Sequence, residues 1–347
     1  MALSRLGLVK TTLIDFPGQV AATVFTPGCN LRCPYCHNPE LVTPPFSETL
    51  LPIEEVRRFL QKRAAVLGGV CITGGEPLLY GKAYGEMVYG GTEEGKLQNS
   101  GDSQRSTEEP AGETGQQNAS AGGLFEFILF CRQLGLKVKL DTNGCFPERL
   151  RPLLATGTEA GSTESTQGPG NGRDTGGGEG ISGGSRTTNG PLLDYIAMDI
   201  KTLPERYHFV HPSAEDNAVQ ATAQAVRQSI NLIVSSGIQH EFRTTMAPGI
   251  ASPDDVVEIA CYLKSAYTSA SSVPRSTNAS SVSNTKANGS PVSSSIELFG
   301  RYILTQFRPG KTLKPDFSNL RPYYNSNLYQ AAEKIRKMGL DCEVRGC

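Results

Sequence analysis

The sequence lacks the features that would assign it to several large classes of protein. It has no run of about 20 apolar residues, which a membrane-spanning helix needs, and residues 1–18 contain no apolar stretch typical of a secretion signal. The formal net charge is only −1, so no overall basic field favours nucleic acid. The nine cysteines are an odd number and show no pattern of disulfide pairs. We therefore expect a soluble, cytoplasmic protein that binds neither membranes nor nucleic acid.

Large apolar residues are also scarce. Hydrophobic residues make up 38% of the chain and tryptophan is absent. Much of the deficit lies in three segments rich in Gly, Ser, Thr, Asn and Gln, at residues 92–123, 156–190 and 268–295. Segments of this composition bury too little apolar surface to offset the entropy of ordering. We interpret them as disordered insertions within a single domain that spans residues 1–347.

Three of the cysteines lie in one short loop. Cys29, Cys33 and Cys36 follow the pattern C-x3-C-x2-C, so one loop can place three thiolates around a metal centre. Four-iron clusters are usually held by four cysteinates, and three leave one iron open to another ligand, as in catalytic metal sites. The alternative is a structural zinc ion, which needs four nitrogen or sulfur ligands. The nearest fourth ligand, His37, directly follows Cys36, an awkward position for completing a tetrahedron.

The rest of the sequence alternates between apolar runs and segments of helical periodicity. We expect strands at 20–25, 69–73, 137–141, 195–199, 241–246, 301–307 and 342–345, and helices at 53–63, 125–134, 148–154, 219–236, 253–267 and 327–338. Repeated strand–helix units with apolar strands predict a parallel sheet covered by helices. The expected fold is α/β, an incomplete (β/α)6 TIM-like barrel with its functional groups at the C-terminal ends of the strands.

Glycine and polar residues follow several of these strands. GGEP at 74–77 follows the second strand, and paired glycines let the backbone approach a ligand closely. DTN at 141–143 and DIK at 199–201 follow the next two strands. Each motif alone is also typical of a plain turn or a surface ion pair. At one sheet edge they could together hold the hydroxyl and carboxylate groups of a ligand, and Asp141 and Asp199 form a candidate site for a monovalent cation.

One arginine, Arg243, lies inside an expected apolar strand. A buried charge without a partner is very costly, so Arg243 needs an anion. That anion is either a carboxylate of a bound ligand or Glu241, which side-chain alternation places on the same face of the strand.

In this order, the motifs resemble the radical S-adenosylmethionine (SAM) superfamily. Within it they resemble the anaerobic ribonucleoside-triphosphate reductase activating proteins, which are close to the pyruvate formate-lyase activating enzymes. The matching segments lie at 7–18, 25–42, 72–79, 137–144, 194–201, 241–249 and 306–313. The resemblance implies an enzyme with one 4Fe-4S cluster that reductively cleaves SAM to a 5′-deoxyadenosyl radical. That radical would generate a glycyl radical on an anaerobic ribonucleotide reductase-like partner, with flavodoxin or ferredoxin as electron donor.

The resemblance also implies roles for single residues. Cys29, Cys33 and Cys36 would ligate the cluster and form the catalytic centre. Arg308 departs from the pyruvate formate-lyase activating enzymes, which carry a histidine near this position. The implied SAM contacts are Tyr35, Gly74, Gly75, Glu76, Asp141, Thr142, Asn143, Asp199, Lys201 and Arg243.

Two other functions remain open. A radical SAM enzyme with a small-molecule substrate, in the manner of 7-carboxy-7-deazaguanine synthases, would use Arg308 and Lys311 to hold an anion at the barrel mouth. After Gly310 we expect only one helix and a short strand, which favours an open mouth and a macromolecular substrate. A metal-binding or iron-storage module without enzymatic activity would leave GGEP and DIK unexplained.

Overall fold

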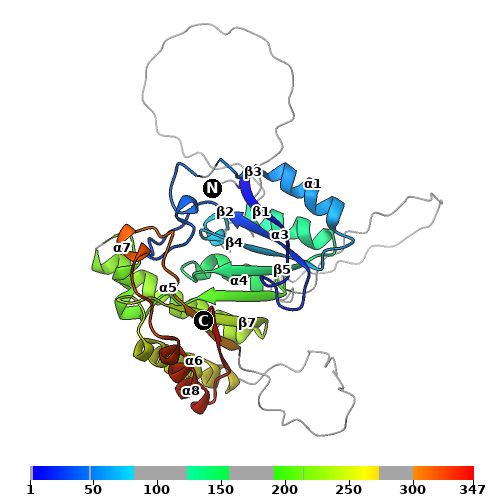
Figure 1. The fold of residues 1–347 in the computed structure, drawn as a ribbon. Helices are drawn as coiled ribbons and strands as arrows, with labels where there is room; N and C mark the ends of the chain where they lie inside the picture. Colours follow the sequence, from blue (N-terminus) through cyan, green and yellow to red (C-terminus); the bar gives the residue numbers. More distant parts are fainter. Residues whose placement is uncertain (1–2, 47, 82–122, 156–190, 214, 273–299) are drawn as a thin grey trace, which may run out of the picture.

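The computed structural model describes residues 3–46, 48–81, 123–155, 191–213, 215–272 and 300–347 (Figure 1). Most of each segment expected to be a disordered insertion lies outside these residues, and so do the predictions made for it. The described residues share one hydrophobic core. None of their helices is both long and apolar enough to cross a lipid bilayer.

A single sheet of nine strands forms the centre of the described part of the chain, in the order β3-β1-β2-β4-β5-β6-β7-β8-β9. Neighbouring strands from β2 to β9 are parallel, whereas β1 pairs antiparallel with β2 and β3. The sheet is open, and it confirms the expected α/β fold with an incomplete barrel. The strands are β1 Arg5–Thr12, β2 Ala21–Thr26, β3 Leu51–Pro52, β4 Gly69–Gly74, β5 Lys137–Thr142, β6 Tyr195–Asp199, β7 Gln239–Met246, β8 Arg301–Gln306 and β9 Cys342–Arg345.

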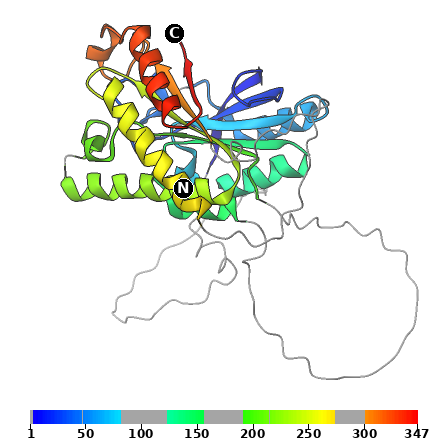
Figure 2. The ribbon, with the colours of Figure 1, turned by 90° about the horizontal axis from the view of Figure 1, so that it is seen from below.

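Helices follow the parallel strands and pack side by side, α4 on α5, α5 on α6 and α6 on α8 (Figure 2). Their apolar stripes cover the sheet, as the periodicity of the sequence predicts. The α-helices are α1 Ile53–Arg63, α3 Leu124–Gln133, α4 Pro147–Leu154, α5 Asp216–Ser236, α6 Pro253–Ser271, α7 Pro315–Ser318 and α8 Asn325–Lys337. Short 3-10 helices lie at η1 Pro39–Leu41, η2 Pro77–Tyr80 and η3 Pro204–Phe209.

Helix α6 shows how local sequence sets a boundary. Ser252 caps its N-terminus, because its hydroxyl accepts a hydrogen bond from the Asp255 backbone at 3.1 Å. The helix then runs to Ser271, so the prediction that disorder begins at residue 268 is wrong for its first residues. Buried Ala266 and Tyr267 extend the apolar stripe to the end of the helix. The Ser271 hydroxyl donates to the Tyr267 carbonyl at 2.9 Å within the helix, so a serine here does not end it.

Strand β1 departs from the sequence expectation, which places no strand before residue 20. Only Leu6 and Thr12 of its residues are buried, so the period-2 pattern that identifies a half-buried strand is missing. Pairing with β2 and β3 holds the strand in place instead. The loop after β1 contributes Ile14, Asp15 and Pro17 to the lining of a cavity that β5, β7, β8 and β9 also line.

Candidate functional site

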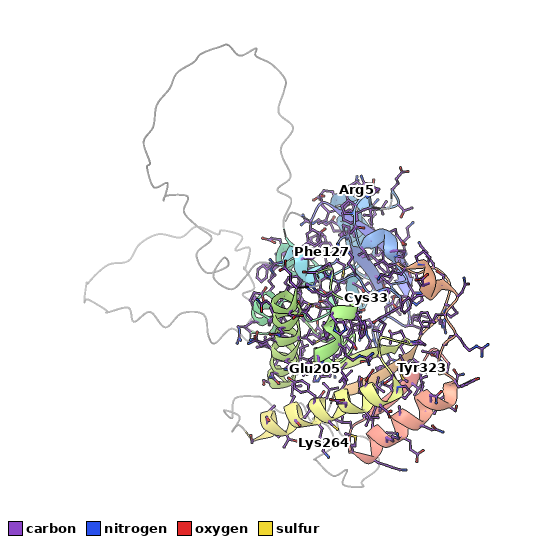
Figure 3. All side chains as sticks on the ribbon, turned by 90° about the vertical axis from the view of Figure 1, so that its left-hand side faces the viewer. Arg5, Cys33, Phe127, Glu205, Lys264 and Tyr323 are labelled. Atoms are coloured by element: carbon purple, nitrogen blue, oxygen red, sulfur yellow. The ribbon has the colours of Figure 1, made fainter. Side chains whose placement is uncertain are left out.

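The cysteine loop follows β2 and is fastened to the protein at several points. The Gly28 backbone, at φ +83°, donates to the Leu41 carbonyl at 2.6 Å, and the Cys29 backbone donates to the Val42 carbonyl at 3.2 Å. The Arg32 guanidinium donates to the Cys29 carbonyl at 2.7 Å. These contacts hold the three cysteines of the motif against one cavity of about 250 Å³, which all three line. Figure 3 shows Cys33 near the middle of the described part of the protein.

The three thiols line one cavity. No group of three or more His, Cys, Asp and Glu side chains in the described residues is arranged to hold one metal ion. A four-iron cluster would bind each thiolate through a different iron, so its ligands need not converge on one point. The same cavity is lined by Tyr35, whose buried hydroxyl has no hydrogen-bond partner in the described part of the chain.

Burial also affects the protonation of two of the thiols, Cys29 and Cys33. Burial raises the pKa of the Cys29 thiol to about 11 and that of Cys33 to about 12. The thiolate is the form that binds metals, and metal binding releases the thiol protons. Cys29 and Cys33 are therefore thiols at neutral pH, and a bound metal centre would replace their protons.

The two glycines of the GGEP motif permit close contact between β4 and the cysteine loop. A Cβ atom on Gly75 would lie 1.9 Å from the Gly28 carbonyl oxygen, and one on Gly74 would lie 2.3 Å from the Thr26 backbone nitrogen. The Gly75 backbone donates to the Thr26 carbonyl at 2.8 Å. Both glycines also line the cavity, so close packing places them at its wall.

Glu76 lies next to the cavity but is not among the residues that line it, and its contact with SAM stays a prediction. Its side chain is fully buried. It accepts hydrogen bonds from the Thr142 hydroxyl at 2.8 Å, the Asn143 backbone at 2.7 Å and the Leu78 backbone at 3.0 Å. Burial raises the pKa of Glu76 to about 7. Glu76 thus ties the end of β4 to the end of β5 and positions Thr142 and Asn143, which do line the cavity.

Charged side chains form the opposite wall. Asp199 accepts from the Lys201 ammonium at 2.9 Å and from the Arg243 guanidinium at 2.7 Å. Asp141 pairs with the same guanidinium at 3.3 Å and with Lys139. Burial alone would raise the pKa of Asp199, but the charges of Arg243 and Lys201 outweigh it and hold that pKa well below its usual range. The Asp199 carboxylate is therefore ionised at the cavity wall.

Arg243 reaches these carboxylates from behind the cavity, which it does not line. Its distance to Glu241 is 3.8 Å, longer than its distances to Asp199 and Asp141. Internal carboxylates are therefore its partners, and Glu241 is the most distant of them. The guanidinium also lies between Asp141 and Asp199, the two residues predicted to bind a monovalent cation. Binding of that cation stays a prediction.

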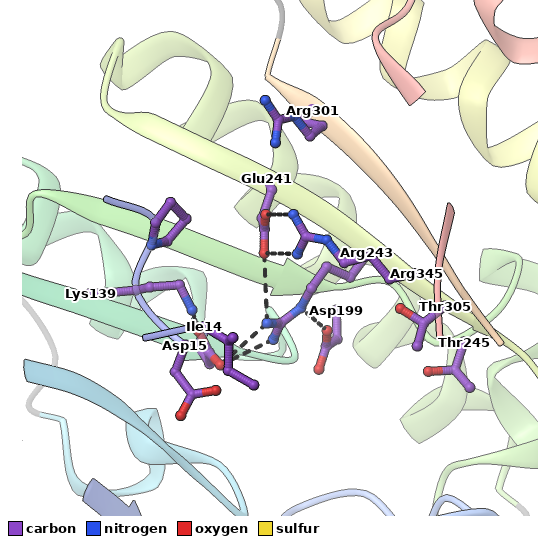
Figure 4. A pocket seen from close by; sticks show the side chains of 12 residues that line it. Ile14, Asp15, Lys139, Asp199, Glu241, Arg243, Thr245, Arg301, Thr305 and Arg345 are labelled. Atoms are coloured by element: carbon purple, nitrogen blue, oxygen red, sulfur yellow. Dashed lines mark hydrogen bonds and ion pairs between the residues drawn. The ribbon is translucent and has the colours of Figure 1, made fainter. Parts of the chain in front are cut away.

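A second and larger cavity, of about 650 Å³, adjoins the first (Figure 4). The two share Asp141, Asp199 and Thr245 in their walls. Its other lining residues, mostly charged, come from the loop after β1 and from the strands β5 and β7 to β9: Ile14, Asp15, Pro17, Lys139, Glu241, Arg243, Arg301, Thr305 and Arg345. Sequence reasoning missed Lys139 and Arg345. Lys139 carries a signal, because it lies between Val138 and Leu140 in an apolar strand, whereas Arg345 ends a strand that also contains Glu343.

The segment after β8 lies against the cysteine loop. Lys311 pairs with Glu40 at 2.8 Å, and the Lys314 backbone donates to the Pro34 carbonyl at 2.9 Å. Arg308 donates to the Gly346 carbonyl at 3.3 Å. The expectation of one helix after Gly310 is wrong, because α7 precedes α8 in the described residues.

Comparisons with known proteins show which sequences the chain is similar to. The sequence profile of the radical SAM superfamily matches residues 23–159, from within β2 to just beyond α4. A putative glycyl-radical enzyme activating enzyme of Methanocaldococcus jannaschii is 22% identical over 258 residues, which are 74% of this chain and 74% of that protein. The pyruvate formate-lyase-activating enzyme of Staphylococcus aureus is 40% identical over 70 residues, 19% of this chain and 28% of that one.

Among solved structures, Streptococcus suis SuiB aligns with a TM-score of 0.45 and 11% identity. The alignment covers 93% of this chain and 48% of that one.

Proposed function

Because the chain is a radical SAM protein with homology to glycyl-radical enzyme activating enzymes, we propose that it generates a glycyl radical on a partner enzyme. The observation that carries this proposal is the contact between two cavities. The cavity lined by the cysteines shares Asp141, Asp199 and Thr245 with a larger, charged one. A radical formed in the first would therefore lie close to a substrate in the second.

Cys29, Cys33 and Cys36 are the residues that would hold a 4Fe-4S cluster. When bound, the cluster supplies an electron and an open iron for SAM, whose reductive cleavage gives the 5′-deoxyadenosyl radical. The protein would hold the cluster and SAM in a fixed relative position inside a cavity. The cysteine loop is fastened by backbone hydrogen bonds, and a fixed geometry of this kind lowers the entropic barrier of the reaction.

The remaining residues of the first cavity match the polar groups of SAM. The ammonium of Lys201 and the carboxylate of Asp199 place both signs of charge on one wall. A zwitterionic methionine group needs both, and ribose hydroxyls are donors for a carboxylate. Tyr35 brings an aromatic ring to the same cavity, where it can pack against the adenine. Thr142 and Asn143 complete the polar wall.

The second cavity favours a protein substrate over a small anion. Its basic residues are already paired: Arg345 with Glu241, Lys139 with Asp141, and Arg301 with Asp341. At the edge of the cavity Ile14 is 88% exposed, and the preceding Leu13 is 72% exposed. Exposed apolar side chains beside a cavity are typical of a surface that meets another protein.

Arg308 and Lys311, the two residues proposed to hold a small anion, have partners of their own in the Gly346 carbonyl and Glu40. We therefore propose as partner an anaerobic ribonucleotide reductase-like enzyme that inserts a glycine-bearing loop, with flavodoxin or ferredoxin as the electron donor. A small-molecule substrate is the second candidate.

The test is anaerobic reconstitution with iron and sulfide, followed by reduction in the presence of SAM and a candidate glycyl-radical enzyme. Electron paramagnetic resonance should detect a glycyl radical on the partner with the wild-type protein and with Cys261→Ala, whose cysteine is exposed on α6. It should detect none with Cys36→Ala. Efficient SAM cleavage that no candidate partner stimulates, but that a heterocycle does, would overturn the activating role.

A further inference from the structure

The last strand of the sheet contributes one side chain to the second cavity. Arg345 of β9 donates to Glu241 of β7 from both terminal nitrogens of its guanidinium, Nη1 at 3.2 Å and Nη2 at 3.1 Å (Figure 4). Its Nε also donates to Glu343 at 2.9 Å. Two parallel bonds of this kind fix the carboxylate in direction as well as in position.

Arg345 reaches β7 across the strand between them. In the register of the sheet, Arg345 lies beside Thr305 of β8, which lies beside Thr245 of β7. Glu241 is further back along β7, opposite Arg301. The Arg345 side chain therefore runs diagonally over β8 to reach Glu241.

Glu241 has few other partners. It is 2% exposed, and its remaining contacts are the Tyr195 hydroxyl at 3.3 Å and the guanidinium of Arg243 at 3.8 Å. A buried carboxylate that loses its cationic partner seeks another, because an uncompensated buried charge is strongly unfavourable. Arg243 is within 4 Å of Glu241. Arg301, which lies opposite Glu241 in the sheet, is held by Asp341 at 3.2 Å and Glu343 at 3.1 Å.

Arg243 is already engaged with the wall of the first cavity. It holds Asp199 at 2.7 Å and Asp141 at 3.3 Å. The charges therefore alternate from β9 to that wall: Arg345, Glu241, Arg243, and then the two aspartates. A Glu241 side chain freed from Arg345 would draw Arg243 away from both aspartates.

We propose that Arg345 is a positioning residue for the SAM site. By holding Glu241, it leaves Arg243 free to fix Asp199 and Asp141 at the cavity wall. This role rests on the proposed binding of SAM in the first cavity, and it is independent of the identity of the final substrate.

The experiment measures SAM affinity by equilibrium dialysis with labelled SAM on the reconstituted holoenzyme. Arg345→Gln should weaken binding roughly tenfold, a size typical of coupling between neighbouring charged groups. Arg345→Lys should recover part of the loss, because lysine keeps the charge but not the two-pronged geometry. The double variant Glu241→Gln/Arg345→Gln should return to within about threefold of wild type, because a neutral amide does not compete for Arg243.

The matched control is Arg336→Gln. Arg336 also supports β9, donating to the Cys342 carbonyl at 2.8 Å, but it lies exposed on α8 away from Glu241. Its loss should lower thermal stability without changing SAM affinity. Iron content and melting temperature, measured for every variant, separate loss of fold from loss of the site.

Two outcomes would overturn the inference. One is an Arg345→Gln holoenzyme that binds SAM as wild type does, and the other is a double variant as weak as Arg345→Gln alone. Failure of the wild-type holoenzyme to bind SAM would instead refute the proposed function, so the two failures are distinguishable.

Discussion

Replacing Gly75 with alanine should displace the cysteine loop and abolish cluster binding. The added Cβ would lie 1.9 Å from the Gly28 carbonyl oxygen and 3.0 Å from that of Leu41. Both are backbone atoms, so neither can rotate away, and the loop must move by roughly 1 Å to restore ordinary contact. Overpacking of this kind costs about 1–3 kcal/mol. The Gly75–Thr26 hydrogen bond, at 2.8 Å, contributes about 1 kcal/mol more.

The assay is iron and sulfide per chain after anaerobic reconstitution, together with the visible absorption of the cluster. Gly135→Ala is the matched control, because Gly135 has φ +77° and no atom near its Cβ position. That control should lose about 1 kcal/mol of stability from backbone strain and keep its cluster. A Gly75→Ala protein with wild-type iron content and wild-type stability would refute the reasoning.

Three further predictions concern surface, pH and stability. Leu13→Ser/Ile14→Ser should change stability by only about 0.5 kcal/mol, because both side chains are exposed. The double variant should cleave SAM as the wild type does when no partner is present. With the partner it should give a lower yield of glycyl radical, measured by paramagnetic resonance. Burial raises the pKa of Glu76 to about 7 from 4.5. The unfolding free energy of the apo-protein should therefore fall as the pH rises from about 4.5 to about 7. Denaturant titrations across this range should show a weaker pH dependence for Glu76→Gln. Ser252→Ala should cost about 1 kcal/mol by calorimetry, with SAM cleavage unchanged.

Local patterns were enough to predict the repeating strands and helices. The boundaries of α1 and β9 agree with the sequence expectation, and β6 agrees as well. These elements carry strong periodicity or a continuous apolar run between clear breaks. Strand β1 and the short helix α7 carry neither, and pairing partners or neighbouring loops hold them in place. Element prediction therefore worked where burial is regular and failed where long-range contacts decide.

The sequence allowed us to predict which residues gather at the cavity, but not which of them line it. Spacing and order placed Cys33, Gly75 and Lys201 around one cavity. They did not show that Glu76 is buried next to the cavity without lining it, because its partners Thr142 and Asn143, at the end of β5, are brought near only by the fold. The partners of Arg243 were likewise open, since the fit of one guanidinium between two aspartates depends on the register of three strands.

The central claim is that the three-cysteine cavity supports reductive cleavage of SAM. Its most direct test is to reconstitute the protein anaerobically, reduce it with dithionite in the presence of SAM, and quantify 5′-deoxyadenosine by chromatography. The account predicts product from the wild type and from Cys261→Ala, and none from Cys33→Ala. A wild-type protein that binds about four irons per chain yet forms no product, or equal product from Cys33→Ala, would contradict it.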